Sequence, residues 1–163
     1  MSQIFISYAR KDSDEVYPIV DMLESNGLSC WIDKEGIESG SPEFENVILD
    51  AIDSSEVFLH MLSPNSKTSK YVKEECKYAA DVKKRIVTVL LHGAIDNPRV
   101  MFGFQTADLI DIYNETQKEK LLRDLRKWVK NDNPSGSSYA AKEESVVGIN
   151  EVVIPVATAG ALP

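Results

Sequence analysis

Short apolar runs alternate along this chain with longer segments of helical period, and no other feature limits its fold so strongly. A strand, a crossover helix and a second parallel strand form a βαβ unit, and repeats of that unit build a parallel sheet covered by helices. The pattern therefore predicts an α/β protein with a parallel sheet. Its strands are expected at residues 3–8, 28–32, 57–62, 86–91 and 109–112.

Helix signals fill the intervals between these runs. The first predicted helix has Asp12 as its N-cap, with Glu15 as the capping-box partner, and ends at Asn26-Gly27. A second helix begins at Ser41-Pro42, a last one covers residues 116–130, and residues 92–106 predict a loop with a short helix. The side chains expected to be buried are Val16, Ile19, Val20 and Leu23 in the first helix, Val47, Ile48, Ala51 and Ile52 in the second, and Leu121, Leu122, Leu125 and Trp128 in the last.

A helix predicted over residues 69–80 places one carboxylate among aromatic side chains. Glu75 lies at the border of the apolar face, whereas its neighbour Glu74 points to the solvated side. The two adjacent acids should therefore have different roles, although Glu75 on helix geometry alone could simply solvate the helix edge. The predicted buried stripe is Val72, Cys76, Ala79 and Ala80, and its border is Tyr71, Glu75 and Tyr78.

Composition narrows the class of protein. The chain has 163 residues, of which 43% are hydrophobic, and this predicts one domain with a single core. A net charge of −8 and a pI near 4.8 argue against a partner that is a nucleic acid or an anionic membrane. No apolar run has the length of a membrane span, and no signal peptide is recognised. Cys30 and Cys76 are expected to be buried free thiols, which favours a cytoplasmic location.

Several familiar sites are missing from the sequence. It contains neither GxGxxG nor GxxxxGK[ST], and it has no Gly-x-Ser-x-Gly elbow for an esterase. A phospho-acceptor receiver domain needs an aspartate at the end of the third strand, but that strand ends in Leu62-Ser63-Pro64. His60 and His92 have no cysteine or carboxylate at metal-ligand spacing, so both are expected to be structural. We therefore predict no metal site and no cofactor.

Ligands of open parallel sheets bind outside the carboxyl ends of the strands. Three strand-to-helix loops should meet there, at residues 7–13, 33–41 and 63–69. The first carries Tyr8, Arg10 and Lys11, which suit a phosphate with an attached base, although an ordinary polar turn is the plain alternative. The second is long and holds two glycines, as a lid or contact loop would.

Five motifs in order resemble a TIR domain of the bacterial type over residues 2–130. The resemblance implies a flavodoxin-like, three-layer sandwich with a five-stranded parallel sheet flanked by helices. It also implies that the loop at 33–41 is the self-association loop, with Gly36, Ile37 and Gly40 as its contact residues. The motifs are Phe5-Ile6-Ser7-Tyr8, Trp31-Ile32-Asp33, Gly36-Ile37-Glu38-Ser39-Gly40, Leu62-Ser63-Pro64-Asn65-Ser66 and Tyr71-Val72-Lys73-Glu74-Glu75.

Some members of that family are adaptors that bind other TIR domains, and others cleave NAD+ at the nicotinamide–ribose bond. Glu75 falls on the position of their catalytic glutamate, and its ionised form would stabilise oxocarbenium character, so its pKa need not be raised. The residues that the resemblance places at the substrate are Tyr8, Ala9, Arg10, Glu38 and Tyr71, with Arg10 on a phosphate. Ala9 and Tyr71 stand where other members have arginine and tryptophan, and Trp31 is expected to serve packing.

The resemblance thus predicts an NAD+ glycohydrolase that releases nicotinamide with ADP-ribose or a cyclic ADP-ribose isomer, as effector of bacterial antiphage defence. Its expected partners are NAD+ as substrate and further copies of itself, in an oligomer or a head-to-tail filament. The alternatives are a TIR–TIR interaction module, including a virulence mimic that interferes with host signalling, and a nucleoside transferase of related architecture.

The chain changes character after residue 131. Residues 1–131 are assigned to the TIR domain, and the Asn-, Pro-, Ser- and Gly-rich stretch that follows is typical of a flexible linker. Residues 132–163 are expected to be a linker or tail, with the start of a truncated second module as the alternative.

Overall fold

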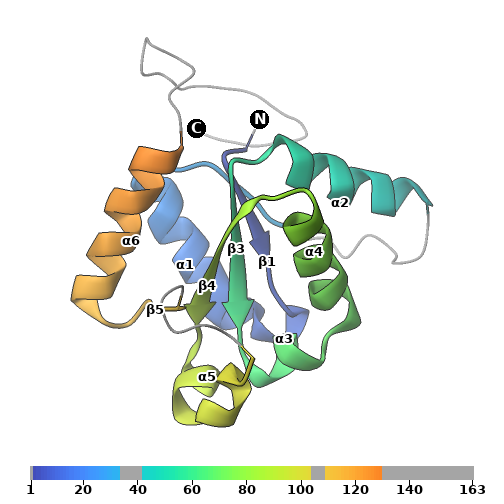
Figure 1. Ribbon diagram of the computed structural model, residues 1–163. Helices are drawn as coiled ribbons and strands as arrows, with labels where there is room; N and C mark the ends of the chain where they lie inside the picture. The colour runs from blue at the N-terminus through green and yellow to red at the C-terminus, as the bar shows by residue number, and fades with distance from the viewer. Residues whose placement is uncertain (1, 34–41, 104–108, 130–163) are drawn as a thin grey trace. The chain divides into compact units, whose positions relative to one another are not determined.

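The computed structural model describes residues 2–33, 42–103 and 109–129. These ranges contain a parallel sheet of five strands in the order β2-β1-β3-β4-β5, so the predicted α/β architecture is confirmed (Figure 1). The strand positions agree with the five apolar runs, although β2 is shorter than its run. The strands are β1 (Ile4–Ser7), β2 (Cys30–Trp31), β3 (Val57–Leu62), β4 (Arg85–Leu90) and β5 (Leu109–Asp111).

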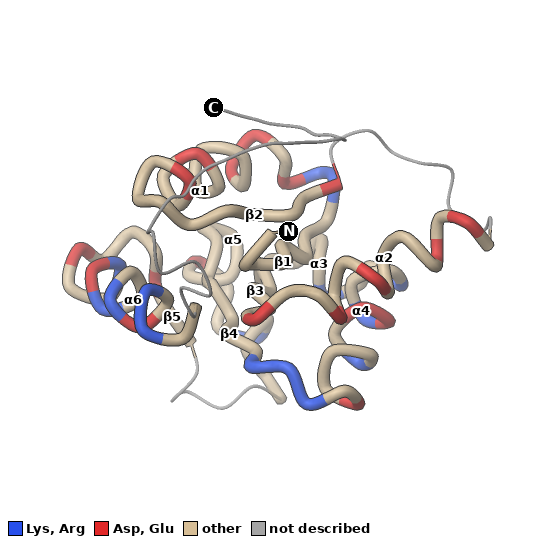
Figure 2. Tube along the Cα trace, turned by 90° about the horizontal axis from the view of Figure 1, so that it is seen from above, with Lys and Arg blue, Asp and Glu red and all other residues tan. Residues whose placement is uncertain are grey.

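Helices cover both faces of this sheet. In Figure 1, α1 and α6 lie on one side and α2 and α4 on the other, and the view from above in Figure 2 agrees. Short helices follow the carboxyl ends of the strands. The helices are η1 (Arg10–Asp12), α1 (Ser13–Ser25), α2 (Pro42–Ser54), α3 (Pro64–Thr68), α4 (Lys70–Asp81), α5 (His92–Asp96), η2 (Pro98–Met101) and α6 (Glu115–Trp128).

The side chains of strand β1 pack in two hydrophobic cores, one on each face of the sheet. Ile4 and Ile6 pack with α1 and α6, whereas Phe5 points to the other face and packs with α2 and α4. The Phe5 ring stacks between Trp31 and Phe58, with centroids 5.0 and 5.2 Å away. Because both faces are covered, all four residues of the strand are buried, and Ile4, Phe5 and Ile6 are apolar in succession rather than alternating with polar residues.

The predicted capping box at the start of α1 is wrong. Asp12 is the N-cap residue of α1, but its side chain makes no capping hydrogen bond. It instead accepts hydrogen bonds from Ser63 and Asn65 across the sheet edge. Glu15 accepts hydrogen bonds from the His92 backbone N–H and from the Tyr113 hydroxyl. Both carboxylates therefore join loops that are distant in sequence.

Helix faces are predicted with a few errors. In α2, Phe44 is buried and Val47 is 44% exposed, which reverses the prediction for Val47. In α4, Val72 and Ala79 are buried as expected, but Ala80 is exposed. In α6, Leu121 and Leu125 are buried, while Leu122 and Trp128 are partly buried.

The described residues belong to one compact unit. The predicted domain boundary at residue 131 and the tail at 132–163 lie outside them. Cys30 and Cys76 are both free and partly buried, and burial raises the pKa of each thiol. Among the described helices, none has the length and apolar character needed to cross a bilayer.

Candidate functional site

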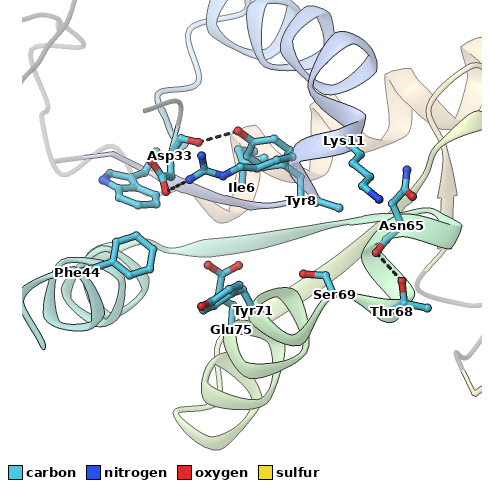
Figure 3. A pocket seen from close by; sticks show the side chains of 13 residues that line it. Ile6, Tyr8, Lys11, Asp33, Phe44, Asn65, Thr68, Ser69, Tyr71 and Glu75 are labelled. Carbon is cyan, nitrogen blue, oxygen red and sulfur yellow. Dashed lines mark hydrogen bonds and ion pairs between the residues drawn. The ribbon is translucent and has the colours of Figure 1, made fainter. Parts of the chain in front are cut away.

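A pocket of about 640 Å³ opens at the carboxyl ends of β1 and β2, between η1, α2, α3 and α4 (Figure 3). This is the edge of the sheet where the sequence predicts that the strand-to-helix loops meet. Its lining residues in the described part of the chain are Ile6, Tyr8, Ala9, Arg10, Lys11, Trp31, Asp33, Phe44, Asn65, Thr68, Ser69, Tyr71 and Glu75.

The helix α4 carries Glu75 into this pocket. Ser69 caps the helix, because its hydroxyl oxygen accepts a hydrogen bond from the Val72 backbone N–H at 3.3 Å. Glu75 lies between the buried and exposed faces of α4, as the helical period predicts. Its neighbour Glu74 is exposed, so the two acids do have different environments.

Ser7, the last residue of β1, holds the Glu75 carboxylate. The fully buried Ser7 hydroxyl donates a hydrogen bond to Glu75 Oε1 at 2.7 Å. Burial raises the pKa of Glu75 from its ordinary value of 4.5 to about 7. The Ser7 hydroxyl and the Arg10 charge oppose that rise, and the Asp33 charge adds to it. The reaction does not require this rise, and the helical period does not predict it, because the depth of the site depends on the packing of α4 against β1.

The two tyrosines at the border of the apolar face of α4 lie in different environments. Tyr71 lines the pocket one turn before Glu75 and is 48% exposed. Tyr78 does not line the pocket and donates a hydrogen bond to Asp53 Oδ1 at 2.8 Å. Trp31 both lines the pocket and stacks on Phe5, so its packing role is confirmed.

The loop after β1 brings Tyr8, Ala9 and Arg10 to the pocket, as predicted. The Tyr8 hydroxyl donates to the Asp33 carbonyl oxygen at 2.7 Å, and burial raises the pKa of that tyrosine. Arg10 forms an ion pair with Asp33, with 2.6 Å between Nη2 and Oδ2. The guanidinium that the resemblance places on a phosphate is therefore already occupied by a carboxylate.

Asp33 and Phe44 line the pocket but were not among the candidate site residues. Asp33 has a sequence signal, because an acid directly after a parallel strand lies at the ligand-binding edge of the sheet. Phe44 has none, since its register in α2 looks like ordinary core packing. The remaining candidates, Glu38 as a substrate contact and Gly36, Ile37 and Gly40 for self-association, lie outside the described residues.

The end of the pocket away from Glu75 is polar. Lys11, Asn65 and Thr68 are found there, and Figure 3 shows the Lys11 side chain extending toward Asn65. Asn65 Nδ2 donates to Asp12 Oδ1 at 2.8 Å, and Ser63 donates to the other oxygen of the same carboxylate. Asp12 thus fixes the loop before α3 against the loop after β1.

Comparisons with known proteins agree with this architecture. A family sequence model described as TIR domain matches residues 4–126. The TIR domain of the Toll-related receptor TRR-2 from Hydra magnipapillata is similar with a TM-score of 0.60 at 21% identity, covering 77% of this chain and 99% of that one. At such identity the likeness shows the fold, which is the flavodoxin-like arrangement of the TIR domain.

A longer protein is similar over part of its length. The TIR-STING receptor from C. gigas, in complex with 2′,3′-cGAMP, matches with a TM-score of 0.56 at 25% identity. The match covers 80% of this chain and 40% of the receptor. A second structure of a C. gigas TIR-STING receptor gives a TM-score of 0.54 at 23% identity, covering 83% of this chain and 43% of that one.

Proposed function

The chain belongs to the TIR domain family, and from that premise we propose that it is an NAD+ glycohydrolase with Glu75 as its catalytic carboxylate. The observation that carries the proposal is the placement of this carboxylate inside a pocket, on the hydroxyl of Ser7. A glutamate that only solvated a helix edge would have no reason to be buried beside a serine from another element.

The chemistry of nicotinamide release suits a single carboxylate. Nicotinamide leaves NAD+ as a neutral molecule, so its departure needs no general acid. The ribose develops oxocarbenium character as the bond breaks, and a nearby negative charge stabilises that state. Water attack then gives ADP-ribose and a proton, for which the Glu75 carboxylate is an acceptor. Attack by the adenine of the same molecule gives a cyclic isomer instead.

The raised pKa of Glu75 is compatible with this role. At pH 7 about half of the free protein holds the ionised form, because the pKa is about 7. The pyridinium ring of NAD+ is positively charged, and an adjacent positive charge favours the ionised carboxylate. Substrate binding therefore produces the charge that the reaction needs.

Aromatic side chains surround the carboxylate. Trp31, Phe44 and Tyr71 line the same pocket, and Figure 3 shows Phe44 and Tyr71 at the Glu75 end of it. They offer flat surfaces for a nicotinamide ring, and they limit the access of water, which strengthens electrostatic interactions inside the site. Self-association of the chain is part of the same proposal, with the loop at 33–41 as the contact.

Nicotinamide release by concentrated protein, with and without a crowding agent, tests the proposal. We expect release from wild type and from Glu74→Gln, which removes the adjacent exposed acid, and loss of at least roughly a hundredfold in Glu75→Gln. No release from folded, associated wild type would favour a TIR–TIR interaction module. Cleavage of nicotinamide riboside in preference to NAD+ would favour a nucleoside transferase.

A further inference from the structure

Among the charged side chains described around the pocket, some pair with each other and others remain available to a ligand. Among the described lining residues, the charged ones are Arg10, Lys11, Asp33 and Glu75. Arg10 and Asp33 neutralise each other through their 2.6 Å ion pair. No ion pair of Lys11 is present within the described ranges, where the salt bridges join other residues. One negative group, Glu75, and one positive group, Lys11, are thus left to meet a ligand.

These two groups lie at different ends of the pocket. Figure 3 shows Glu75 with Tyr71 and Phe44 at one end, and Lys11 with Asn65 and Thr68 at the other. The charges that act on the Glu75 carboxylate are those of Asp33 and Arg10, which agrees with a position of Lys11 farther along the pocket. The pocket therefore changes from aromatic and anionic to polar and cationic along its length.

The polar end is held in place by contacts of its own. Asn65 is fixed by its 2.8 Å hydrogen bond to Asp12, and the Thr68 hydroxyl donates to the Asn65 carbonyl oxygen at 3.2 Å. The Asp12 carboxylate accepts from Ser63 and Asn65, so both of its oxygens are engaged. Lys11 belongs to η1 directly before Asp12, so its backbone is attached at this end of the pocket.

We infer that Lys11 forms, with Asn65, an anion subsite that takes the diphosphate of a dinucleotide, so that the substrate lies with its cationic nicotinamide riboside at Glu75 and its phosphates toward Lys11. The inference rests on the proposed function for the identity of the cationic end. A dinucleotide of this class is positive at the pyridinium and negative at the diphosphate, and the free charges of the pocket have the complementary order.

Binding of ADP-ribose tests the subsite without turnover, because this ligand has the diphosphate and no nicotinamide. By isothermal titration we expect the Kd to rise roughly tenfold in Lys11→Gln and to stay at the wild-type value in Lys127→Gln, a charge removed from the exposed face of α6. A double variant, Arg10→Gln with Asp33→Asn, removes the ion pair without changing the net charge, and its effect should be smaller than that of Lys11→Gln.

Steady-state kinetics provide a second test of the anion subsite. The ratio of kcat/KM for NAD+ to kcat/KM for nicotinamide riboside, which has no phosphate, should fall roughly tenfold in Lys11→Gln. Equal ADP-ribose binding by wild type and Lys11→Gln, no binding by either, or a larger loss in the Arg10/Asp33 variant would overturn the inference. The proposed function fails separately, when wild type releases no nicotinamide, since ADP-ribose binding needs no reaction.

Discussion

At the scale of single residues, the contact between Ser7 and Glu75 connects the fold to the proposed reaction. Since the ionised carboxylate is the active form, kcat/KM for NAD+ should rise with pH through about 7 and level off above it. Ser7→Ala removes the hydroxyl that favours the ionised form, so the pKa of Glu75 should rise further. We expect the acidic limb of the pH–rate profile to move upward by ~1 pH unit.

Ser54→Ala is the control for that shift. Its hydroxyl donates to the Ala51 carbonyl oxygen at the end of α2 and does not touch the pocket. The acidic limb of the pH–rate profile should not move in this variant. If that limb does not move in Ser7→Ala either, a group other than Glu75 sets the pH dependence.

Glu75 should cost the protein stability at neutral pH. Its pKa of about 7 in the folded state exceeds the ordinary 4.5, so the folded state binds the proton more tightly than the unfolded state. The free energy of unfolding therefore falls as pH rises from about 4.5 to about 7. Glu75→Gln removes the charge, and we expect it to be more stable than wild type by on the order of 2 kcal/mol at pH 8.

Urea unfolding at pH 4 and pH 8 measures this effect. At pH 4 the carboxyl group is largely protonated in both states, so the variant and wild type should differ little. The matched control Glu74→Gln should change stability by less than about 0.5 kcal/mol at either pH. A Glu75→Gln protein less stable than wild type at pH 8 would show that the native site favours the charged carboxylate.

The sequence predicts the position of Glu75 but not its partners. Helical period is local, so it separates Glu75 from Glu74 and places Tyr71 beside it. The hydrogen bond to Ser7 spans 68 residues, and the pair of Arg10 with Asp33 spans 23. Neither follows from a local pattern, so the sequence predicts neither the pairing of Arg10 with a carboxylate nor the raised pKa of Glu75.

At the scale of secondary-structure elements, Asp12 fastens the loop after β1 to the loop before α3. Its carboxylate accepts from the buried Ser63 hydroxyl and from Asn65. Asp12→Ala leaves the Ser63 donor without this acceptor, so we expect a loss of about 2–3 kcal/mol in the free energy of unfolding. Asp12→Asn keeps a carbonyl acceptor and should lose less.

The control for Asp12 is Asp14→Ala, which removes an exposed acid from the first turn of α1. Chemical denaturation should show a change of less than about 1 kcal/mol for it. If Asp12→Ala behaved like Asp14→Ala, the bridge between the two loops would not contribute to stability.

The same carboxylate shows why element ends are harder to predict than elements. The run at 57–62 coincides with β3 because five apolar residues and His60, bounded by Glu56 and Ser63, permit little else. An acid at the start of a helix, in contrast, can cap that helix or can bind a residue that is distant in sequence. Asp12 and Glu15 both bind distant residues. The prediction that Val47 is buried is wrong for a related reason. Both Val47 and Phe44 fit an apolar stripe of α2, but Phe44 is the one that packs in the core against the sheet.

At the scale of the whole molecule, the order of the strands creates the site. β1 lies between β2 and β3, so the residues that end these strands meet around one pocket. Alternation of strands and helices predicts a parallel sheet but not the order of its strands. The flavodoxin-like arrangement followed from the resemblance of five motifs to the TIR family, and the family match supports it.

Charge should control the self-association that we propose. The net charge is −8, and α1 and α2 carry Asp and Glu but no Lys or Arg (Figure 2). Copies of the chain therefore repel one another at low ionic strength, and salt screens that repulsion. At saturating NAD+, nicotinamide release per molecule should increase several-fold as salt rises from about 10 mM to about 150 mM, where the Debye length falls from roughly 30 to 8 Å.

The same reasoning predicts a dependence on protein concentration. Release per molecule should rise with concentration and reach a common plateau, with salt lowering the concentration at half-maximum. Light scattering on the same samples should follow the activity. Replacing Gly36 or Gly40 should reduce both signals more than it reduces stability, because the loop at 33–41 is the proposed contact. Release per molecule that is constant over concentration and salt, beside a monomeric scattering mass, would mean that one copy holds the complete site.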